Sequence, residues 1–367
     1  MISVFGSSVG KEEIAQITES INNQWMGMGP KTKEFETRMA ERYSPCGFLL
    51  TDSGSNALYM ALSLLNLPAG SEVIVPSFTW VACAQVVMLV GCVPVFCDVD
   101  LETQNVTAET IKPCITDKTA AIMVVHYGGL PCEMDEIMAL GYPVIEDAAH
   151  AVDSIYKGKR CGTIGDIGCF SFDAIKNIAI GEGGGLVSAN KDYMDRAKTL
   201  RYCGIGKSGF EASTHGKSRW WEYNIQEAFI KMNPSDIAAG IGLAQLSKLD
   251  SMQTRRQEIW NIYQQEFGKL DWIITPKDEN EGDKHSYFTY FIRVEGRDEF
   301  AQYLYDNGIY TTLRYHPLHL NPLYKSNAKL PNAERLNEDG LNIPLHPKLS
   351  DGDVDKIIET IKKYHKS

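Results

Sequence analysis

The nine cysteines of the sequence include no CxxC pair, the spacing that is typical of zinc sites and redox-active disulfides. Their number is odd, and several lie inside apolar runs such as Gly168-Cys169-Phe170. Such cysteines are typical of small buried hydrophobic residues in a reducing compartment. We therefore interpret them as core residues.

Positive charge is in deficit, because 36 basic residues face 47 acidic ones and the net charge is −11. This balance argues against nucleic-acid binding. It still allows an anionic small substrate, since a local group of arginines can outweigh the overall sign.

Long hydrophobic runs are also missing. The most apolar window, residues 81–97, is shorter than a membrane span and is interrupted by Gln85, Gly91 and Pro94. We interpret it as a helix followed by a strand. Residues 1–5 lack the basic and apolar regions of a signal peptide. We therefore expect a cytoplasmic protein with no membrane partner.

The chain does contain a long alternation of strand and helix patterns, and its 367 residues suit one large and one smaller domain. Most predicted strands are continuous apolar runs, the pattern of a parallel sheet covered by helices on both faces. These strands are 73–75, 93–99, 121–125, 144–146, 168–172 and 186–188. Helices are predicted over 11–24, 31–43, 57–62, 79–90, 106–113, 132–140 and 191–200.

The pattern changes after residue 231. Residues 231–237 open a long helix that continues beyond Leu249 and links the two domains, with Pro234 placed for its first turn. The remainder combines strand patterns with helical ones, which suits a small α+β domain. Its predicted strands are 287–294 and 309–313, and its predicted helices are 298–306 and 351–364.

Functional residues of parallel sheets gather at the carboxyl ends of the strands. The notable polar residues at these positions are Ser77, His126, Asp147, Ser171 and Lys176.

Lys176 lies between the apolar run 168–172 and a glycine cluster at 181–185. Lysine forms a Schiff base with aldehyde cofactors when it is held in a fixed, partly desolvated position. The glycines would let the backbone pass close to a cofactor ring. On these residues alone, a solvated lysine before a glycine-rich turn is the better interpretation.

Asp147 follows the buried strand 144–146. An unpaired buried carboxylate is costly, and the pyridine nitrogen of a cofactor would be a suitable partner. Asp147 would keep that nitrogen protonated so that the ring can accept electrons. A carboxylate that caps the following helix is an equally good interpretation of this residue alone.

Residues 53–56, Ser-Gly-Ser-Asn, stand immediately before a helix, where N–H groups and the helix dipole favour a phosphate. A plain N-cap explains them as well. Trp80 could stack on a flat ring, although an aromatic residue here is more often part of the core.

Two other motifs carry no function. The pair His316 and His319 has no third ligand nearby, so we predict no metal site. Gly206-Lys207-Ser208 resembles the end of a P-loop, but Arg201 stands where the first glycine is required. We interpret 203–220 as an exposed loop, with a cover over an anionic ligand as the alternative.

Taken together, the motifs resemble the DegT/DnrJ/EryC1/StrS family of pyridoxal-phosphate (PLP)-dependent sugar aminotransferases, from about residue 3 to residue 364. Each motif is weak alone, but they occur in the family's order. They are Gly27-Met28-Gly29-Pro30, Ser53-Gly54-Ser55, Pro76-Ser77-Phe78-Thr79-Trp80, Glu146-Asp147-Ala148-Ala149-His150, Ser171-Phe172 with Lys176, Glu182-Gly183-Gly184, Lys231-Met232-Asn233 and Pro344-Leu345-His346-Pro347.

The resemblance implies an α/β fold of PLP-dependent transferase type I. A large PLP-binding domain over 1–250 would have a mostly parallel sheet between helices, and 251–367 would form the small domain. The cofactor is expected to be pyridoxal 5'-phosphate.

The resemblance also implies roles for single residues. Lys176 would be the Schiff-base lysine and Asp147 the partner of the ring nitrogen, and both are catalytic candidates. The other implied PLP contacts are the phosphate seat of Gly54, Ser55 and Ser171, the stacking residue Trp80, His150 on the hydroxyl side of the ring, and Asn233, which would reach the phosphate of the neighbouring subunit in a homodimer with shared sites. Arg314, His319 and Lys231 are the candidate substrate contacts.

Two positions depart from the family pattern, and the segment 314–319, which resembles the family's substrate-facing C-terminal loop, does not fix the sugar by its exact form. Ser55 stands where threonine is common, which keeps the hydroxyl group. Asp173 stands where histidine or tyrosine is frequent, and it adds a negative charge near Lys176.

The activity that the resemblance implies is ping-pong transfer of an amino group from L-glutamate to a nucleotide-linked keto-sugar. We expect a 4-keto-6-deoxyhexose and a 4-amino sugar for a surface polysaccharide such as the O-antigen of a lipopolysaccharide. Amination at C3, a cyclitol substrate and a non-catalytic protein with a vestigial site are the alternatives. Lys176 argues against a dehydratase, since family dehydratases carry histidine at this position.

Overall fold

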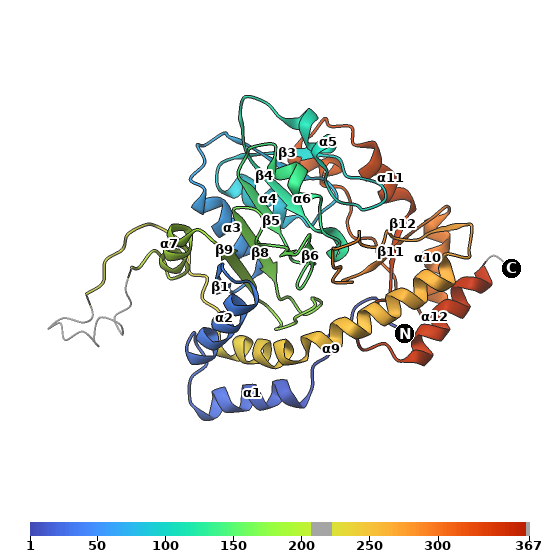
Figure 1. Cartoon of the computed structure of the whole chain (residues 1–367), viewed down its shortest axis with the longest axis horizontal. Helices are drawn as coiled ribbons and strands as arrows, with labels where there is room; N and C mark the ends of the chain where they lie inside the picture. Colours follow the sequence, from blue (N-terminus) through green and yellow to red (C-terminus); the bar gives the residue numbers. More distant parts are fainter. Residues whose placement is uncertain (207–221, 365–367) are drawn as a thin grey trace.

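The computed structural model describes residues 1–206 and 222–364 of the chain. A seven-stranded sheet in the order β1-β9-β8-β5-β4-β2-β3 forms the centre of the larger part (Figure 1). In this sheet β9 pairs antiparallel with β1 and β8, and the other neighbouring strands are parallel. The prediction of a mostly parallel α/β sheet is confirmed. The strands are β1 (Gly47–Thr51), β2 (Glu72–Pro76), β3 (Val93–Cys97), β4 (Thr119–Val125), β5 (Val144–Asp147), β8 (Ile167–Ser171) and β9 (Gly184–Ser188).

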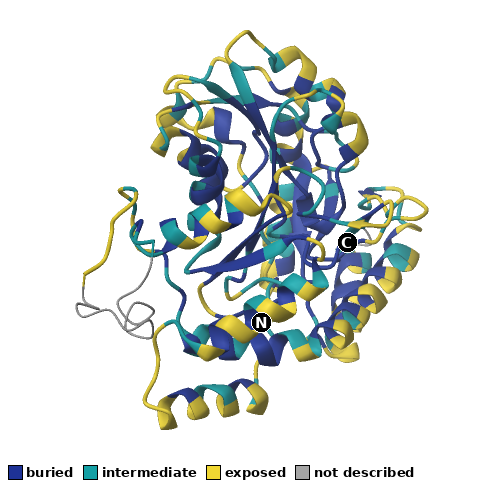
Figure 2. Cartoon of the chain, turned by 60° about the vertical axis from the view of Figure 1, so that its left-hand side comes forward, coloured by how far each residue is buried: buried dark blue, intermediate teal, exposed yellow. Residues whose placement is uncertain are grey.

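Helices surround this sheet, and most of them pack apolar side chains against it (Figure 2). They begin and end close to the predicted positions, except that the predicted helix 106–113 is split into a short α-helix and a 3₁₀ turn, η1 (Lys112–Cys114). The α-helices are α1 (Lys11–Asn22), α2 (Pro30–Arg42), α3 (Gly54–Leu64), α4 (Ala82–Leu89), α5 (Ala108–Ile111), α6 (Met134–Met138) and α7 (Lys191–Arg201).

The long helix α9 (Asp236–Phe267) begins later than predicted, because the side chain of Ser235 caps it by accepting the N–H of Ala238. Its first half packs in a core cluster with α2, and its second half packs in a separate cluster with the C-terminal elements. The predicted domain boundary at residue 250 falls inside this one helix. The division into 1–250 and 251–367 stays a prediction.

The C-terminal part is built on a three-stranded antiparallel sheet in the order β10-β11-β12. Its elements are β10 (Ile273–Ile274), β11 (Tyr290–Val294), β12 (Gly340–Ile343), α10 (Arg297–Asp306), α11 (Pro331–Asp339), α12 (Asp351–Lys363) and the 3₁₀ turns η3 (Leu318–Leu320) and η4 (Pro322–Tyr324). The predicted strand 309–313 is wrong. Ile309 forms an isolated parallel bridge with Ile2, whereas Thr312 forms an isolated antiparallel bridge with Asn342. These residues therefore do not form one continuous strand.

The first residues of the chain lie against this C-terminal part, where Figure 1 shows the N-terminus beside α9 and α12. Ile2 forms a parallel bridge with Ile309. His346 Nε2 lies 3.1 Å from the backbone oxygen of Ser3. Residues from the two ends of the chain therefore meet.

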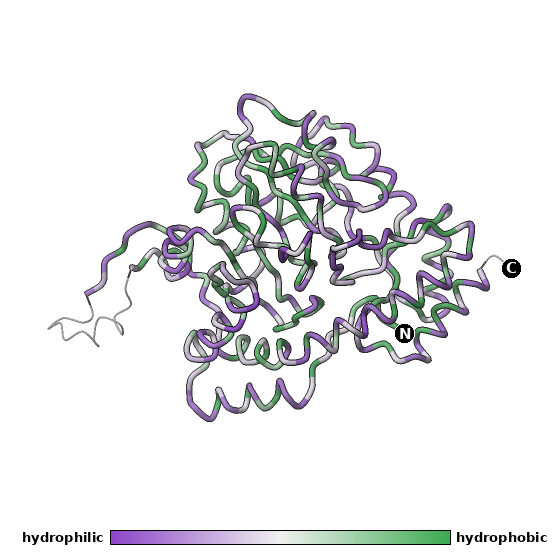
Figure 3. Tube along the Cα trace, in the orientation of Figure 1, coloured by the Kyte–Doolittle hydropathy of each residue, from purple (hydrophilic) through white to green (hydrophobic). Residues whose placement is uncertain are grey.

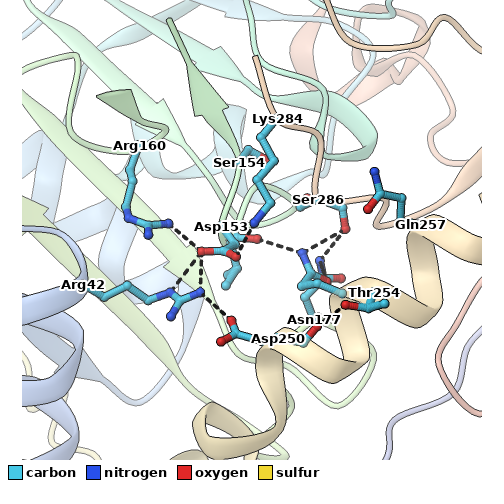
Figure 4. Close-up of polar contacts among 12 residues, drawn as sticks. Arg42, Asp153, Ser154, Arg160, Asn177, Asp250, Thr254, Gln257, Lys284 and Ser286 are labelled. Carbon is cyan, nitrogen blue, oxygen red and sulfur yellow. Dashed lines mark hydrogen bonds and ion pairs between the residues drawn. The ribbon is translucent and has the colours of Figure 1, made fainter. Parts of the chain in front are cut away.

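A buried carboxylate ties the C-terminal part to the larger one. Asp153, whose side chain is 2% exposed, binds Arg42 of α2 at 2.6 Å, Arg160 at 2.5 Å and Lys284 at 2.9 Å (Figure 4). Arg160 belongs to a short hairpin of β6 (Ile155–Tyr156) and β7 (Lys159–Arg160). Burial by itself raises the pKa of Asp153, but the hydrogen bond from Lys284 and the charge of Arg42 outweigh it, and the pKa falls below its ordinary value.

Hydrophobic residues gather in the central strands, and hydrophilic ones line the outer helices (Figure 3). Within 1–206 and 222–364, none of the helices has the length and apolar character needed to cross a bilayer.

Candidate active site

A cavity of about 490 Å³ opens at the carboxyl ends of β5 and β8. It brings together residues from the larger part, the C-terminal part and the N-terminal segment. Eight of the predicted site residues line it: Gly54, Ser55, Trp80, Asp147, His150, Ser171, Lys176 and Arg314.

Lys176 stands in the loop that follows β8, where its N–H closes a turn onto the carbonyl of Asp173 at 2.9 Å. Its Nζ atom lies 4.8 Å from the centre of the Phe288 ring. Burial, together with the charge of Arg314, lowers the pKa of Lys176 to about 8. A minor fraction of the side chain is therefore a free amine near neutral pH, as a nucleophilic or basic lysine requires.

Asp147 ends β5 and keeps only 5% of its surface exposed. Oδ1 accepts the N–H of Ala149 at 2.9 Å, and Oδ2 accepts the thiol of Cys83 at 3.2 Å. Burial and the Asp147 charge raise the pKa of Cys83 far above its usual value, so the thiol stays protonated and donates. The carboxylate is thus oriented from two sides. Sequence reasoning missed Cys83, because a cysteine in an apolar helix has the pattern of a core residue.

The start of α3, where a phosphate seat is predicted, lies at the wall of the cavity. Ser53 caps the helix by accepting the N–H of Asn56 at 3.1 Å, and the first N–H groups of a helix have no partner inside it. A Cβ atom on Gly54 would lie 2.8 Å from Cβ of Ser171, so only glycine fits there without displacement. Ser53 therefore caps the helix as one interpretation predicted, and Gly54 and Ser55 line the cavity, while the binding of a phosphate here stays a prediction.

The glycine cluster after Lys176 has a different role from the predicted one. A Cβ atom on Gly184 would lie 2.2 Å from the carbonyl oxygen of Ser53, and one on Gly185 would lie 2.3 Å from the Phe48 ring. These glycines let β9 pass close to β1 and the start of α3. They lie behind the start of α3, and of residues 181–185 only Glu182 lines the cavity.

His150 is buried in a stack of aromatic rings. The centre of its ring lies 4.1 Å from the centre of the Phe288 ring. Nδ1 accepts the N–H of Gly128 at 3.3 Å, and Nε2 lies 3.1 Å from the hydroxyl of Tyr315. Burial and the nearby charge of Lys176 lower the pKa of His150 well below its usual value. The imidazole is therefore neutral, and with Nδ1 accepting, Nε2 donates to Tyr315.

Trp80 is 54% exposed in the cavity wall, and its ring centre lies 5.8 Å from that of Tyr315. The exposed indole of Trp80 suits stacking on a planar ligand better than a place in the core.

Arg314 is a buried cation that faces the cavity with 5% of its surface exposed. The guanidinium carbon lies 4.0 Å from the ring centre of Phe5 and 5.0 Å from that of Phe288. Its Nε atom is buried without a hydrogen-bond partner among the residues that the structure describes. A buried cation in this state suits an anionic ligand.

Three predicted residues lie outside this cavity. His319 is buried between Ser77, at 2.6 Å from Nδ1, and Glu334, at 3.2 Å from Nε2. Lys231 is exposed, and Asn233 has a buried Oδ1 atom without a partner in the described part of the chain. The roles of these three residues in substrate or cofactor binding stay predictions.

The other polar residues at strand ends hold the framework together. His126 Nε2 lies 2.9 Å from Oε2 of Glu146 inside the core, and Ser77 holds His319. Most of the predicted loop 203–220 lies outside the described residues. Within 1–206 and 222–364, the histidines, cysteines and carboxylates form no group of three or more that could hold a metal ion.

The family model "DegT/DnrJ/EryC1/StrS aminotransferase family" matches residues 7–362. The chain belongs to this family. The sequence is similar to dTDP-4-dehydro-2,3,6-trideoxy-D-glucose 4-aminotransferase of Saccharopolyspora spinosa, with 36% identity over 99% of this chain and 96% of the relative. It is also similar to the spore coat polysaccharide biosynthesis protein SpsC of Bacillus subtilis, with 35% identity over 96% of this chain and 94% of the relative.

The fold is similar to the PLP form of Spr1654 from Streptococcus pneumoniae, with a TM-score of 0.89 and 30% identity over 98% of this chain and 97% of that one. The protein is thus a sugar aminotransferase of the DegT/DnrJ/EryC1/StrS family and depends on PLP. The predicted family, type I fold, enzyme class and cofactor are confirmed.

The cavity of this family member fits PLP in size and in chemistry. Its volume of about 490 Å³ is that of a small-molecule site. The Lys176 amine, the Asp147 carboxylate and the start of α3 face the same space. They match, in this order, the aldehyde, the ring nitrogen and the phosphate of PLP. The cradle at Gly54, which a Cβ atom would fill, completes the match.

Proposed function

We propose that this aminotransferase moves the amino group of L-glutamate to C4 of a nucleotide-linked 4-keto-6-deoxyhexose and so makes a 4-amino sugar for a surface polysaccharide. The observation that carries the proposal is the cavity in which Lys176, Asp147 and the start of α3 converge. The name of the S. spinosa relative supports C4 amination of a nucleotide-linked sugar. The name of the B. subtilis relative supports a product that enters a surface polysaccharide. That polysaccharide belongs to a spore coat, so the name does not single out an O-antigen.

PLP, when bound, supplies the electron sink that stabilises a carbanion next to nitrogen. Asp147 would hold the protonated ring nitrogen, and the start of α3 with Ser171 would hold the phosphate. Trp80 would cover one face of the ring, and the neutral His150 lies beside it. Lys176 Nζ would remove the α-proton of the donor, because its lowered pKa leaves it basic and partly unprotonated near neutral pH.

Arg314 would hold the α-carboxylate of glutamate, since a planar fork of N–H groups suits a carboxylate. Arg314→Ala should raise the KM for glutamate. Unchanged kinetics with both substrates would remove Arg314 from the site.

We extend the proposal to a homodimer with shared sites. Large apolar side chains are exposed beside α2, on α4 and before α9: Trp25, Met26, Leu89, Tyr223, Ile225 and Ile230. The backbone of Met232 accepts the N–H of Asp52 at 3.2 Å, which places Lys231 and Asn233 close to the start of α3. In the proposed dimer, the two sites would lie at the interface of the subunits, and these residues would reach across it to the site of the partner subunit.

Subunit complementation tests the shared site. Lys176→Ala and Asn233→Ala proteins should each be inactive alone, and mixed dimers should regain activity at one intact site. Light scattering that finds only monomers, or a mixture that stays inactive although mixed dimers form, would contradict the shared site.

The first experiment on the activity is the absorbance spectrum of the purified protein, before and after addition of glutamate. Wild type should show the visible band of bound PLP and lose it with glutamate, whereas Lys176→Ala should not respond. Cofactor-loaded wild type that does not respond to glutamate would refute the donor. A panel of C3- and C4-keto-sugar nucleotides and a keto-cyclitol, given to the aminated enzyme, then identifies the acceptor, and a preference for C3 or for the cyclitol would refute the C4 assignment.

A further inference from the structure

We propose that Phe5 is a positioning residue that, with Phe288, clamps the guanidinium group of Arg314 for the α-carboxylate of the amino donor. The inference rests on the proposed function and adds a role for the N-terminal segment, residues 2–8. This segment would set the affinity for the donor without touching the reacting atoms.

The clamp consists of two aromatic rings, one from the N-terminal segment and one from the C-terminal part. The guanidinium carbon of Arg314 lies over both rings, 4.0 Å from the centre of Phe5 and 5.0 Å from that of Phe288. Both distances are within the range of cation–π contacts, and arginine stacks well on aromatic faces. Two rings fix the plane of the guanidinium group and leave its N–H edge for a ligand.

The Phe288 wall is rigidly held. The N–H of Phe288 donates to the carbonyl of Gly128 at 2.9 Å. Two residues earlier, the carbonyl of Ser286 accepts the side-chain amide of Asn177 at 2.9 Å (Figure 4). It also accepts the side-chain amide of Gln253 at 3.2 Å. Asn177 follows Lys176 directly, so the same contacts fix the lysine loop.

The Phe5 wall depends on contacts of the N-terminal segment with the C-terminal part. The N–H of Ile2 donates to Gly308 at 2.8 Å, and the N–H of Tyr310 donates to Ile2 at 2.9 Å. On the other side of Phe5, a Cβ atom on Gly6 would lie 2.5 Å from the His346 ring, so the chain passes flat over that ring. Phe5 is thus anchored on both sides and lines the cavity.

The position of Arg314 relative to Lys176 favours a carboxylate over a diphosphate. Lys176 Nζ lies 4.8 Å from the centre of the Phe288 ring, the ring that Arg314 also contacts. In an α-amino acid, the carboxylate is one bond from the carbon that loses its proton. In a nucleotide-linked 4-keto-sugar, the sugar ring separates the phosphate from the reacting carbon. An anion held by Arg314 beside Lys176 therefore matches the donor.

The size of the effect follows from the stacking. A cation–π contact contributes about 0.5–2 kcal/mol, which corresponds to a roughly two- to thirty-fold change in affinity. Phe5→Leu keeps an apolar side chain but removes the ring face, and Phe5→Tyr keeps the ring. Val9→Ala alters an exposed residue directly after this segment and outside the cavity, and it is the matched control.

Binding of glutarate to the PLP-loaded protein, measured by calorimetry, tests the clamp without turnover, because glutarate carries two carboxylates and no amino group. We expect Phe5→Leu to weaken glutarate binding about two- to thirty-fold, and Phe5→Tyr and Val9→Ala to stay within about twofold of wild type. In the Arg314→Met background, Phe5→Leu should have no further effect. In single-turnover assays, Phe5→Leu should impair the glutamate half-reaction and leave the keto-sugar half-reaction unchanged.

Unchanged glutarate binding in Phe5→Leu would overturn the clamp, and so would an equal loss in both half-reactions, which would mark Phe5 as merely structural. An undiminished effect of Phe5→Leu without Arg314 would overturn it as well. Failure of the proposed function is a separate result, since it appears as a wild type that does not respond to glutamate.

Discussion

Lys176 carries a charge that destabilises the folded chain, so Lys176→Met should stabilise the cofactor-free protein at pH 7. Burial, reinforced by the charge of Arg314, lowers the pKa of Lys176 from 10.5 to about 8. Because one pKa unit corresponds to ~1.4 kcal/mol, the ammonium form loses about 3 kcal/mol on folding. The side chain lines an open cavity, where water screens part of this loss. We expect the free energy of unfolding to rise by about 1–3 kcal/mol.

The stabilisation depends on pH with a defined sign. Between pH 8 and 10.5, the unfolded chain still binds a proton at residue 176 that the folded protein has released. The stability of wild type therefore rises with pH in this window. The advantage of Lys176→Met is full below pH 8 and shrinks as the pH approaches 10.5.

Urea unfolding of both cofactor-free proteins at pH 7 and at about pH 10 measures the difference. Lys191→Met, at a side chain that is 85% exposed, is the control and should change stability by less than about 0.5 kcal/mol. The reasoning is refuted if Lys176→Met unfolds at the same or a lower urea concentration than wild type at pH 7. A gain that is equal at both pH values would also refute it.

Three further substitutions test the framework of the site. Cys83→Ala should weaken PLP binding severalfold in equilibrium dialysis, because Asp147 loses a hydrogen bond of about 1 kcal/mol, and Cys83→Ser should restore it. Gly54→Ala places Cβ 2.8 Å from Cβ of Ser171 and should lower PLP affinity about tenfold or more, whereas wild-type affinity would contradict the phosphate seat. Asp153→Asn should lower the free energy of unfolding by about 3 kcal/mol, because three cations lose their counter-charge. The pKa of Asp153 lies below its ordinary value of 3.8. The higher stability of wild type relative to Asp153→Asn is therefore present above pH 3.8 and should be lost as the pH falls further. Urea unfolding at neutral and at acidic pH measures this loss.

The sequence was most informative where a polar residue follows a buried run. Lys176 and Asp147 were found in this way, because parallel strands end at one edge and deliver their following residues to one place. The rule does not separate function from framework, since Ser77 and His126 stand at equivalent positions and bind other side chains.

The elements that sequence reasoning missed lack a local signal. The apolar run of β9 does not encode the direction of the strand, and the five residues of β1 stand between two helices with too little periodicity to be recognised. Phe5 and Phe288 lie far apart in the sequence, and a lone phenylalanine has the pattern of a core residue. Only the tertiary structure places both rings on one guanidinium group.

The shared helix α9 has a consequence for how the protein comes apart. Its 32 residues supply side chains to two hydrophobic clusters, with Leu243 and Leu249 in one and Trp260 and Tyr263 in the other. Melting either cluster would remove the packing that keeps the helix formed for the other. Unfolding should therefore be a single cooperative calorimetric transition, and amides along the whole of α9 should exchange their hydrogens together, only when the entire molecule opens.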